Sequence, residues 1–310
     1  IGKGGSIAFG VNSTTVGNQN IAVGTHSTAI GVRNVAGDIS TVIGHNNTAT
    51  GNSSTAVGQA NIASGPLSTS VGANNQSTSD HSSTFGSGNQ AAGQFSSAIG
   101  ALNKALKNNS NAFGYSNSAE AVYSSAFGSA NIASGVRSTA VGYNNTATGL
   151  NSSAFGHTNK AEVQSSMAFG IGNIASGVES SAVGNQNQAS GYQSVAIGSL
   201  NKASGLYSTA VGVSSEVLTT ASNSTAIGYK SLADEANTVS FGRSGQEKRL
   251  TNVASGTKNT DAVNKKQMDD SVTIVNNRVT ANSSDISNLQ QGVGSLNASV
   301  VSYDDSTTKD

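Results

Sequence analysis

A glycine recurs at every fourteenth position from Gly44 to Gly212, which makes thirteen glycines in an unbroken series. The residue before each of these glycines is apolar, and the residue before that is usually alanine. A globular domain with loops of variable length does not keep such a count, whereas stacked identical units do. The repeat therefore predicts a solenoid.

Each fourteen-residue unit divides into two halves of seven. A second glycine recurs midway between the strict ones, as in Asn61-Ile62-Ala63-Ser64-Gly65. Seven residues are too few for a helix that turns and returns, but they suit one strand of four or five residues and a tight corner. We expect glycine to supply the positive φ at these corners. Two such strands make one coil of a parallel β-solenoid.

The alternation of side chains along each strand predicts which residues point inward. In the second half-unit, Lys104, Lys160 and Lys202 recur at one position, and lysine cannot line a thin interior without partners. The alanines beside them must then face inward. By the same register the alanines of the first half also face inward, and the apolar residue before each strict glycine faces outward. This predicted outer row consists of Val57, Val71, Phe85, Ile99, Phe113, Phe127, Val141, Phe155, Phe169, Val183, Ile197 and Val211.

An apolar row on the outside of a solenoid needs a cover. About fifteen stacked coils would place a continuous apolar stripe in water, and a monomer rarely exposes more than a few hundred Å² of such surface. The sequence therefore predicts a homo-oligomer whose axis runs along the outer row.

The composition excludes several classes of protein. Charged residues make up 10% and aromatic residues 5%, with a single proline, Pro66, whereas about a quarter of an ordinary globular domain is charged. The formal net charge is zero, so the chain lacks the excess of basic residues that is typical of nucleic-acid-binding proteins. Cysteine is absent, which excludes disulfides and thiolate metal sites and fits export of an unfolded chain through a membrane pore. Because the chain starts at Ile1 without a signal peptide, we expect it to be a piece of a longer protein.

Beyond Gly242 the glycine repeat stops, and a heptad pattern follows a connector. Apolar residues recur at alternating spacings of four and three, interrupted only by Asn282, which predicts a coiled coil. Valine and isoleucine fill the a positions and the d positions are mixed, so the number of strands is only weakly specified. Gly292 and Gly294 each cost about 1 kcal/mol of helix propensity, so this helix needs partners. The heptad residues are Met268, Val272, Val275, Val279, Asn282, Ile286, Leu289, Val293, Leu296, Val300 and Tyr303.

These three segments together resemble one known family. The unit Ser54-Thr55-Ala56-Val57-Gly58, followed by residues 61–65, resembles the YadA-like head of trimeric autotransporter adhesins, and residues 249–267 resemble the neck of that family. The heptads resemble its stalk. The resemblance divides the chain into a head at residues 1–236, a neck at 237–267, a stalk at 268–303 and the start of a further module at 304–310.

The resemblance implies an all-β, left-handed parallel β-roll in three parallel chains, followed by a neck and an α-helical trimeric coiled coil. It implies a virulence-associated adhesin at the cell surface of a Gram-negative bacterium, with an outer-membrane anchor outside this segment. Its expected partners are host extracellular matrix proteins of the collagen, fibronectin or laminin class, or host cell receptors. It implies multivalent attachment and no enzymatic activity.

Asn282 is a polar residue at a d position, where it costs stability but specifies register. In a three-stranded coil three such amides meet on the axis, and stalks of the family with asparagine at d often hold an anion there. We expect a structural chloride at Asn282, with register control alone as the alternative. No other cofactor is expected.

Other functions find less support in the sequence. The four histidines, His26, His45, His81 and His157, lie far apart on different coils, so a shared metal site is not expected. A row of threonines that begins at Thr14 could suggest an ice-binding solenoid. Other residues replace threonine further along the chain, however, and a coiled coil has no role in binding an ice surface. An acyltransferase on a β-helix would use six-residue rather than seven-residue half-units. A purely structural spacer remains an alternative to the adhesin.

Overall fold

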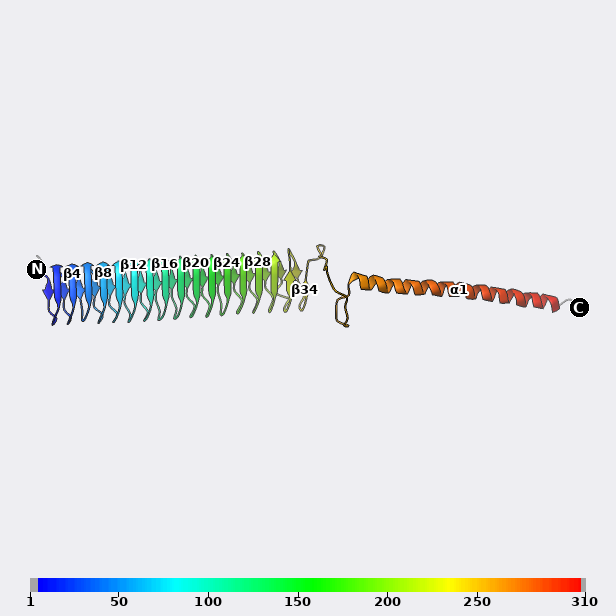
Figure 1. Cartoon of the computed structure of the whole chain (residues 1–310), viewed down its shortest axis with the longest axis horizontal. Coiled ribbons are helices and arrows are strands. Elements are labelled where there is room, and N and C mark those ends of the chain that lie inside the picture. Colours follow the sequence, from blue (N-terminus) through cyan, green and yellow to red (C-terminus); the bar gives the residue numbers. More distant parts are fainter. Residues whose placement is uncertain (1–4, 308–310) are drawn as a thin grey trace. The chain divides into compact units, whose positions relative to one another are not determined.

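The computed structural model describes residues 5–307, with the side chains of the C-terminal helix described as far as Val301. The chain forms two compact units, residues 1–247 and residues 248–310. The first unit is a stack of β-coils and the second is a connector followed by one long helix (Figure 1). The stack confirms the predicted parallel β-solenoid.

Two parallel sheets form the roll, and each coil contributes one short and one long strand. Residues fourteen apart are paired along nearly the whole stack, so that Val57 lies beside Val71 and Gly58 beside Gly72. The short strands are β1 (Ile7–Ala8), β3 (Ile21–Ala22), β5 (Val35–Ala36), β7 (Thr48–Ala49), β9 (Ile62–Ala63), β11 (Gln76–Ser77), β13 (Gln90–Ala91), β15 (Lys104–Ala105), β17 (Ser118–Ala119), β19 (Ile132–Ala133), β21 (Thr146–Ala147), β23 (Lys160–Ala161), β25 (Ile174–Ala175), β27 (Gln188–Ala189), β29 (Lys202–Ala203), β31 (Glu216–Val217) and β33 (Leu232–Ala233). The strands of the other sheet are β2 (Thr14–Asn18), β4 (Thr28–Val32), β6 (Thr41–His45), β8 (Thr55–Gln59), β10 (Thr69–Ala73), β12 (Ser83–Ser87), β14 (Ser97–Ala101), β16 (Asn111–Tyr115), β18 (Ser125–Ser129), β20 (Thr139–Tyr143), β22 (Ser153–His157), β24 (Met167–Ile171), β26 (Ser181–Asn185), β28 (Val195–Ser199), β30 (Thr209–Val213), β32 (Thr225–Ile227) and β34 (Val239–Ser240).

The core of the roll is a double column of alanines, as the sequence predicts. Ala56 of the long strand and Ala63 of the short strand are both fully buried, and the equivalent alanines of the other coils are buried as well. Because alanine is so small, the two sheets lie close together and each coil is flat. Only somewhat larger residues replace alanine at the inward positions, and Val42, Thr84 and Val217 are fully buried there.

The corners differ from the prediction. Besides the strict glycine, each coil has two corner residues with positive φ, and these are mostly not glycine: Ala60 has φ 53° and Leu67 has φ 54°. The expectation that the midway glycines supply the corner conformation is therefore wrong, because Gly65 does not have a positive φ. Gly65 is needed for another reason, since a Cβ at this position would lie 2.0 Å from the backbone oxygen of Ser79 in the next coil.

The strict glycines are needed for two reasons: they have a positive φ, and a Cβ at their position would collide with the next coil. Gly58 has φ +119°, and a Cβ there would lie 2.0 Å from the backbone oxygen of Gly72. Any other residue would be strained and would also push the next coil away. This explains why the spacing of these glycines never varies between Gly44 and Gly212.

A column of buried asparagines, which was not predicted from the sequence, runs through the roll. Each asparagine donates from Nδ2 to a carbonyl four residues earlier and to the strict glycine's carbonyl in the next coil; for Asn145 these are Val141 at 2.9 Å and Gly156 at 2.7 Å. From Asn47 onward each also donates to the Oδ1 of the preceding asparagine, and the column ends where Ser215 bonds to Asn201. The column therefore satisfies buried polar groups that the alanine core cannot. Its members are Asn20, Asn34, Asn47, Asn61, Asn75, Asn89, Asn103, Asn117, Asn131, Asn145, Asn159, Asn173, Asn187 and Asn201.

The end of the roll is less regular. A longer corner follows β31, where Ala221 is fully buried and closes the coil. The last strand, β34, lies just after residue 236 and pairs with β32. The limits predicted for head, neck and stalk stay predictions.

The helix α1 (Lys265–Thr307) begins with a reciprocal cap. Asn264 Oδ1 accepts the backbone N–H of Gln267 at 3.0 Å, and Gln267 Oε1 accepts the backbone N–H of Asn264 at 3.3 Å. This is a capping box, which satisfies two N–H groups at the start of a helix. Gln267 also bonds both backbone groups of Gly256, so the first turn of α1 is tied to the connector. The helix runs through residues 304–307, and residues 308–310 of the predicted further module lie outside the described residues.

Candidate interaction surface

The predicted outer row lies on the outer face of the long-strand sheet. Each of its twelve members is the third residue of a long strand, and none of them is buried in the single chain. Phe169 is the most exposed at 54%, while the alanine before it, Ala168, is fully buried. The structure therefore brings the row together on one surface, although the single chain shows nothing of what covers it.

A second row accompanies the first on the same face. The residue two positions earlier, such as Thr55 beside Val57, also points outward because strand residues alternate between faces. It is half-buried in nearly every coil. In the sequence this row suggested only a possible ice-binding ladder, and its link to the apolar row was not predicted. We call the two rows together the long-strand face.

The sizes of the two side chains in each strand compensate for each other. Phenylalanine in the outer row is paired with serine or asparagine in four strands, as with Ser125 and Phe127 in β18. Valine or isoleucine is usually paired with threonine or valine, as with Thr139 and Val141 in β20. A surface that met only water would show no such compensation. A roughly constant volume per layer is typical of a face packed against a partner of constant cross-section.

The exceptions are compensated in the neighbouring layer. Strand β24 carries two large residues, Met167 and Phe169, and it pairs with β26, which carries the small pair Ser181 and Val183. Strand β14 also has a small pair, and it lies between β12 and β16, which both carry phenylalanine. Where the summed side-chain volume of one strand is unusually large or small, the neighbouring strands therefore compensate for it.

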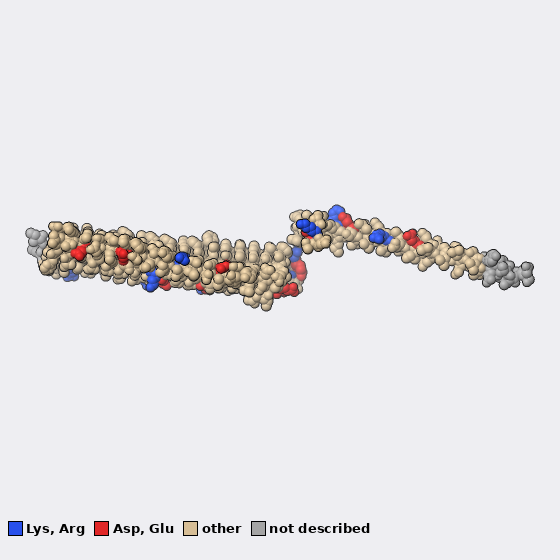
Figure 2. Space-filling view, turned by 90° about the horizontal axis from the view of Figure 1, so that it is seen from below, with Lys and Arg blue, Asp and Glu red and all other residues tan. Residues whose placement is uncertain are grey.

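Aromatic contacts run along this face from coil to coil. The rings of Phe113 and Phe127 are stacked with centroids 5.1 Å apart, and those of Phe155 and Phe169 lie 6.3 Å apart. Charged residues are few on the face of the roll drawn in Figure 2, and no large patch of one sign forms there. The face drawn there therefore offers little charge to a partner.

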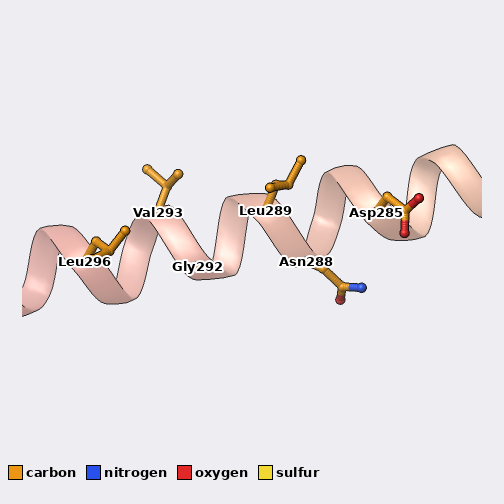
Figure 3. A pocket seen from close by; sticks show the side chains of 6 residues that line it. All are labelled: Asp285, Asn288, Leu289, Gly292, Val293 and Leu296. Carbon is orange, nitrogen blue, oxygen red and sulfur yellow. The ribbon is translucent and has the colours of Figure 1, made fainter.

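The heptad residues of α1 are also uncovered in the single chain. Leu289 and Val293 project from the same side of the helix, and Asn288 from the opposite side (Figure 3). Leu289 is 68% exposed. Asn282 lies on this helix and is exposed, and the chloride expected there stays a prediction. Among the described residues, no helix has both the length and the apolar character needed to cross a bilayer.

Two carboxyl groups near the junction of the roll and the helix have a lowered pKa. Asp261 accepts the backbone N–H groups of Thr257 and Lys258, each at 2.9 Å. Hydrogen bonds from Thr257 first and Lys258 second lower the pKa of the Asp261 carboxyl, because they stabilise its charged form. The pKa of Glu247 is lowered in the same way, by backbone N–H groups of Glu247 and Gly245. Each of these carboxylates therefore holds a backbone turn.

The histidines are dispersed over the roll. His81 is paired with Asp80, at 2.7 Å, and His157 stacks on Tyr143. Within the described part of the chain, no group of three or more His, Asp or Glu side chains is placed to hold a metal ion.

Two family models match the chain. The model described as the YadA head domain repeat matches residues 3–34, 36–61, 105–131, 133–159, 147–173, 164–187, 175–201, 189–215 and 220–244, which together make up more than half of the chain. The model described as the coiled stalk of trimeric autotransporter adhesin matches residues 249–291. The chain belongs to the YadA-like trimeric autotransporter adhesins, and it contains head and stalk segments.

A solved structure gives a more particular likeness. The collagen-binding domain of the Yersinia adhesin YadA is 32% identical to this chain, over 59% of this chain and 86% of that one, with a TM-score of 0.35. No curated protein sequence matches the chain.

Proposed function

We propose that this chain is the passenger part of a homotrimeric surface adhesin that attaches a bacterium to host extracellular matrix or cell-surface ligands. The long-strand face supports the trimer most directly. Its two rows are unpartnered in one chain, yet their side-chain volumes compensate as in a packed interface.

A second copy of the chain is the partner that fits this face. Its coils repeat at the same strand spacing of about 4.8 Å, so layers of two copies stay in step along the whole roll. A closed ring in which identical faces surround one axis leaves none of them in water. Three copies agree with the family and with the exposed heptad seam of α1, which also needs parallel partners.

Attachment would come from repetition. A trimer presents each exposed corner three times, and the corners recur along the roll, so weak contacts sum to a strong one. Collagen, fibronectin and laminin are the ligands proposed, and the bacterial outer membrane is the proposed location, with the anchor outside this segment. The charge-poor surface gives no reason to propose an enzymatic reaction.

Sedimentation equilibrium tests the trimer. The unsubstituted chain is expected at three times its 30.8 kDa mass, and the double variant Phe113→Asp/Phe127→Asp should reduce that mass because six carboxylates cannot be buried at the axis. Ile132→Asp is the matched control, since Ile132 is 40% exposed on the opposite sheet. A monomer for the unsubstituted chain would contradict the proposal.

Binding of the purified trimer to coats of collagen, fibronectin, laminin and albumin tests attachment. Binding to at least one matrix protein, and not to albumin, is expected. A trimer that binds none of these coats, and does not adhere to host cells, would support the spacer alternative instead.

A further inference from the structure

The two ends of each long strand change character halfway along the roll. We call the third residue before a long strand its start edge and the last residue of the strand its finish edge; for β20 these are Val136 and Tyr143. The start edge lies in the corner that leads into the strand. The finish edge points outward like the first and third residues of the strand, because side chains alternate between the two faces of a sheet. Both edges therefore border the long-strand face.

The start edge is mostly polar in the first half of the roll and mostly apolar in the second. From residue 11 to residue 108 its only apolar members are Val11 and Pro66. From residue 122 to residue 206 its only polar member is Gln164. Its apolar members in this second stretch are Val122, Val136, Leu150, Val178, Tyr192 and Leu206.

The finish edge changes within one coil of the start edge. From residue 18 to residue 101 its only large apolar side chain is Val32. From residue 115 to residue 213 it carries several, and the ring of Tyr143 stacks on His157 with centroids 5.1 Å apart. Its large apolar members in this stretch are Tyr115, Tyr143, Ile171 and Val213, each between 44% and 56% exposed.

The polar start edge forms hydrogen bonds with itself inside one chain. Asp38 accepts the backbone N–H of Thr25 at 2.9 Å, and Asp80 accepts a hydrogen bond from Gln94 Nε2 at 3.2 Å. The backbone N–H of Gln94 donates to Asn108 Oδ1 at 3.1 Å. Apolar side chains cannot form such bonds, so the second half of the start edge leaves apolar surface in water unless a partner covers it.

The adjacent corner residue does not change in the same way. This residue, which follows the start edge and has a positive φ, is apolar at Leu67 in the first half. In the second half it includes the charged Arg137 and Glu179 as well as Tyr123 and Tyr207. The corner as a whole therefore does not become more apolar, and the change is specific to the start edge.

Rotational symmetry brings the two edges together. In a ring of three identical chains each contact is heterologous, so the start edge of one protomer meets the finish edge of the next. Rotation about the axis leaves every coil at its own height, and Val136 and Tyr143 are seven residues, or half a coil, apart. They therefore lie within about 2.4 Å of the same level. A change on one edge should then be matched on the other in the same coils, as it is at residues 115 and 122.

We propose that the start edge of each protomer packs against the finish edge of its neighbour, and that between residues 115 and 213 this contact is an apolar seam that the first half of the roll lacks. The inference rests on the proposed trimer and names surfaces beyond the long-strand face. The partner is a second copy of the chain, because both edges adjoin the long-strand face and become apolar together. The second half of the roll is held by the face and the seam, and the first half by the face alone, so the second half contributes more to the stability of the trimer.

Disulfide formation tests the contact in the full chain, which contains no cysteine of its own. Oxidation of Val136→Cys/Tyr143→Cys with diamide should give a covalent trimer on a denaturing gel without reductant, because three disulfides close the ring. A disulfide within one chain is excluded, since the five residues of β20 span about 13 Å between the two positions and a disulfide needs Cα atoms within about 7 Å. Leu206→Cys/Val213→Cys tests the same contact in another coil.

The matched controls for the disulfides are the single-cysteine variants and Ile132→Cys/Tyr143→Cys, in which Ile132 lies on the other sheet. None of these should form a covalent trimer. A trimer in sedimentation equilibrium in which neither edge pair forms disulfides would overturn the seam. A monomer would overturn the trimer proposal as well, so the two failures can be told apart.

Serine substitutions test the apolar character of the seam. Val136→Ser/Tyr143→Ser should lower the urea concentration at which the sedimentation mass falls below that of a trimer, because three apolar contacts are lost at once. Asn52→Ser/Gln59→Ser changes the same two positions in the first half, where both residues are exposed and polar, and should leave that concentration unchanged. Circular dichroism checks that both variants keep the fold. Equal shifts in the two variants, or no shift in either, would overturn the proposal.

Discussion

Removal of one asparagine from the buried column should weaken the whole roll. In Asn145→Ala five side-chain hydrogen bonds disappear: those to Val141, Gly156 and Asn131, and two from Asn159. At about 1 kcal/mol for each of the five bonds, the loss is about 5 kcal/mol of unfolding free energy. Ala at this site cannot replace the amide, and its smaller volume adds a cavity.

The assay is urea unfolding followed by circular dichroism, at one fixed protein concentration because an oligomer's stability depends on concentration. The matched control is Asn144→Ala, one residue away, where Asn144 is exposed with φ 53°. Ala60 and Ala130 occupy the same corner position in other coils, so this change should cost about 1 kcal/mol or less. Equal effects of the two substitutions would refute the reasoning that the column, rather than the alanine core alone, stabilises the stack.

Three further predictions follow from the glycines, the stalk and the connector. Gly128→Ala should destabilise the roll in thermal melting, because its Cβ would lie 2.1 Å from the backbone oxygen of Gly142, whereas Gly88→Ala should be tolerated since it meets only the end of the Leu102 side chain. Tolerance of both changes would contradict the steric argument. Asn282→Val should raise the melting temperature of the stalk and remove any difference between chloride and a non-halide salt of equal ionic strength; a wild-type stalk that melts alike in both salts would exclude the chloride. Because the pKa of Asp261 is lowered in the fold, its stabilisation is present above the ordinary value of 3.8 and is lost as the pH falls through the lower folded value. Asp261→Ala should therefore remove part of the acid sensitivity of connector and helix melting measured by circular dichroism, and an unchanged pH profile would count against this role.

The solenoid, its register and its inward alanines could be predicted from the sequence because each rests on a local, repeated constraint. Gly58 and its equivalents recur strictly, and lysines such as Lys104 cannot enter a thin interior. The direction of Val57 and its row then follows from the period of two along a strand. The capping box of Asn264 and Gln267 was also visible in the sequence, as an Asn with Gln three residues later, and was missed.

The corners, the asparagine column and the paired rows of the long-strand face were decided only by the tertiary structure. Positive φ at Leu67, and its absence at Gly65, depend on where the next coil's backbone passes, which no single coil reveals. Asn145 is hydrophilic, so its residue type alone predicts exposure to water. In the stacked coils, however, its amide is buried and donates to the backbone carbonyls of Val141 and Gly156. The sequence by itself determined the repeat and its two faces, because these follow from neighbours along the chain. Contacts fourteen residues apart determined which residues lie beside one another across coils, and so which side chains are strained, buried or left for a partner.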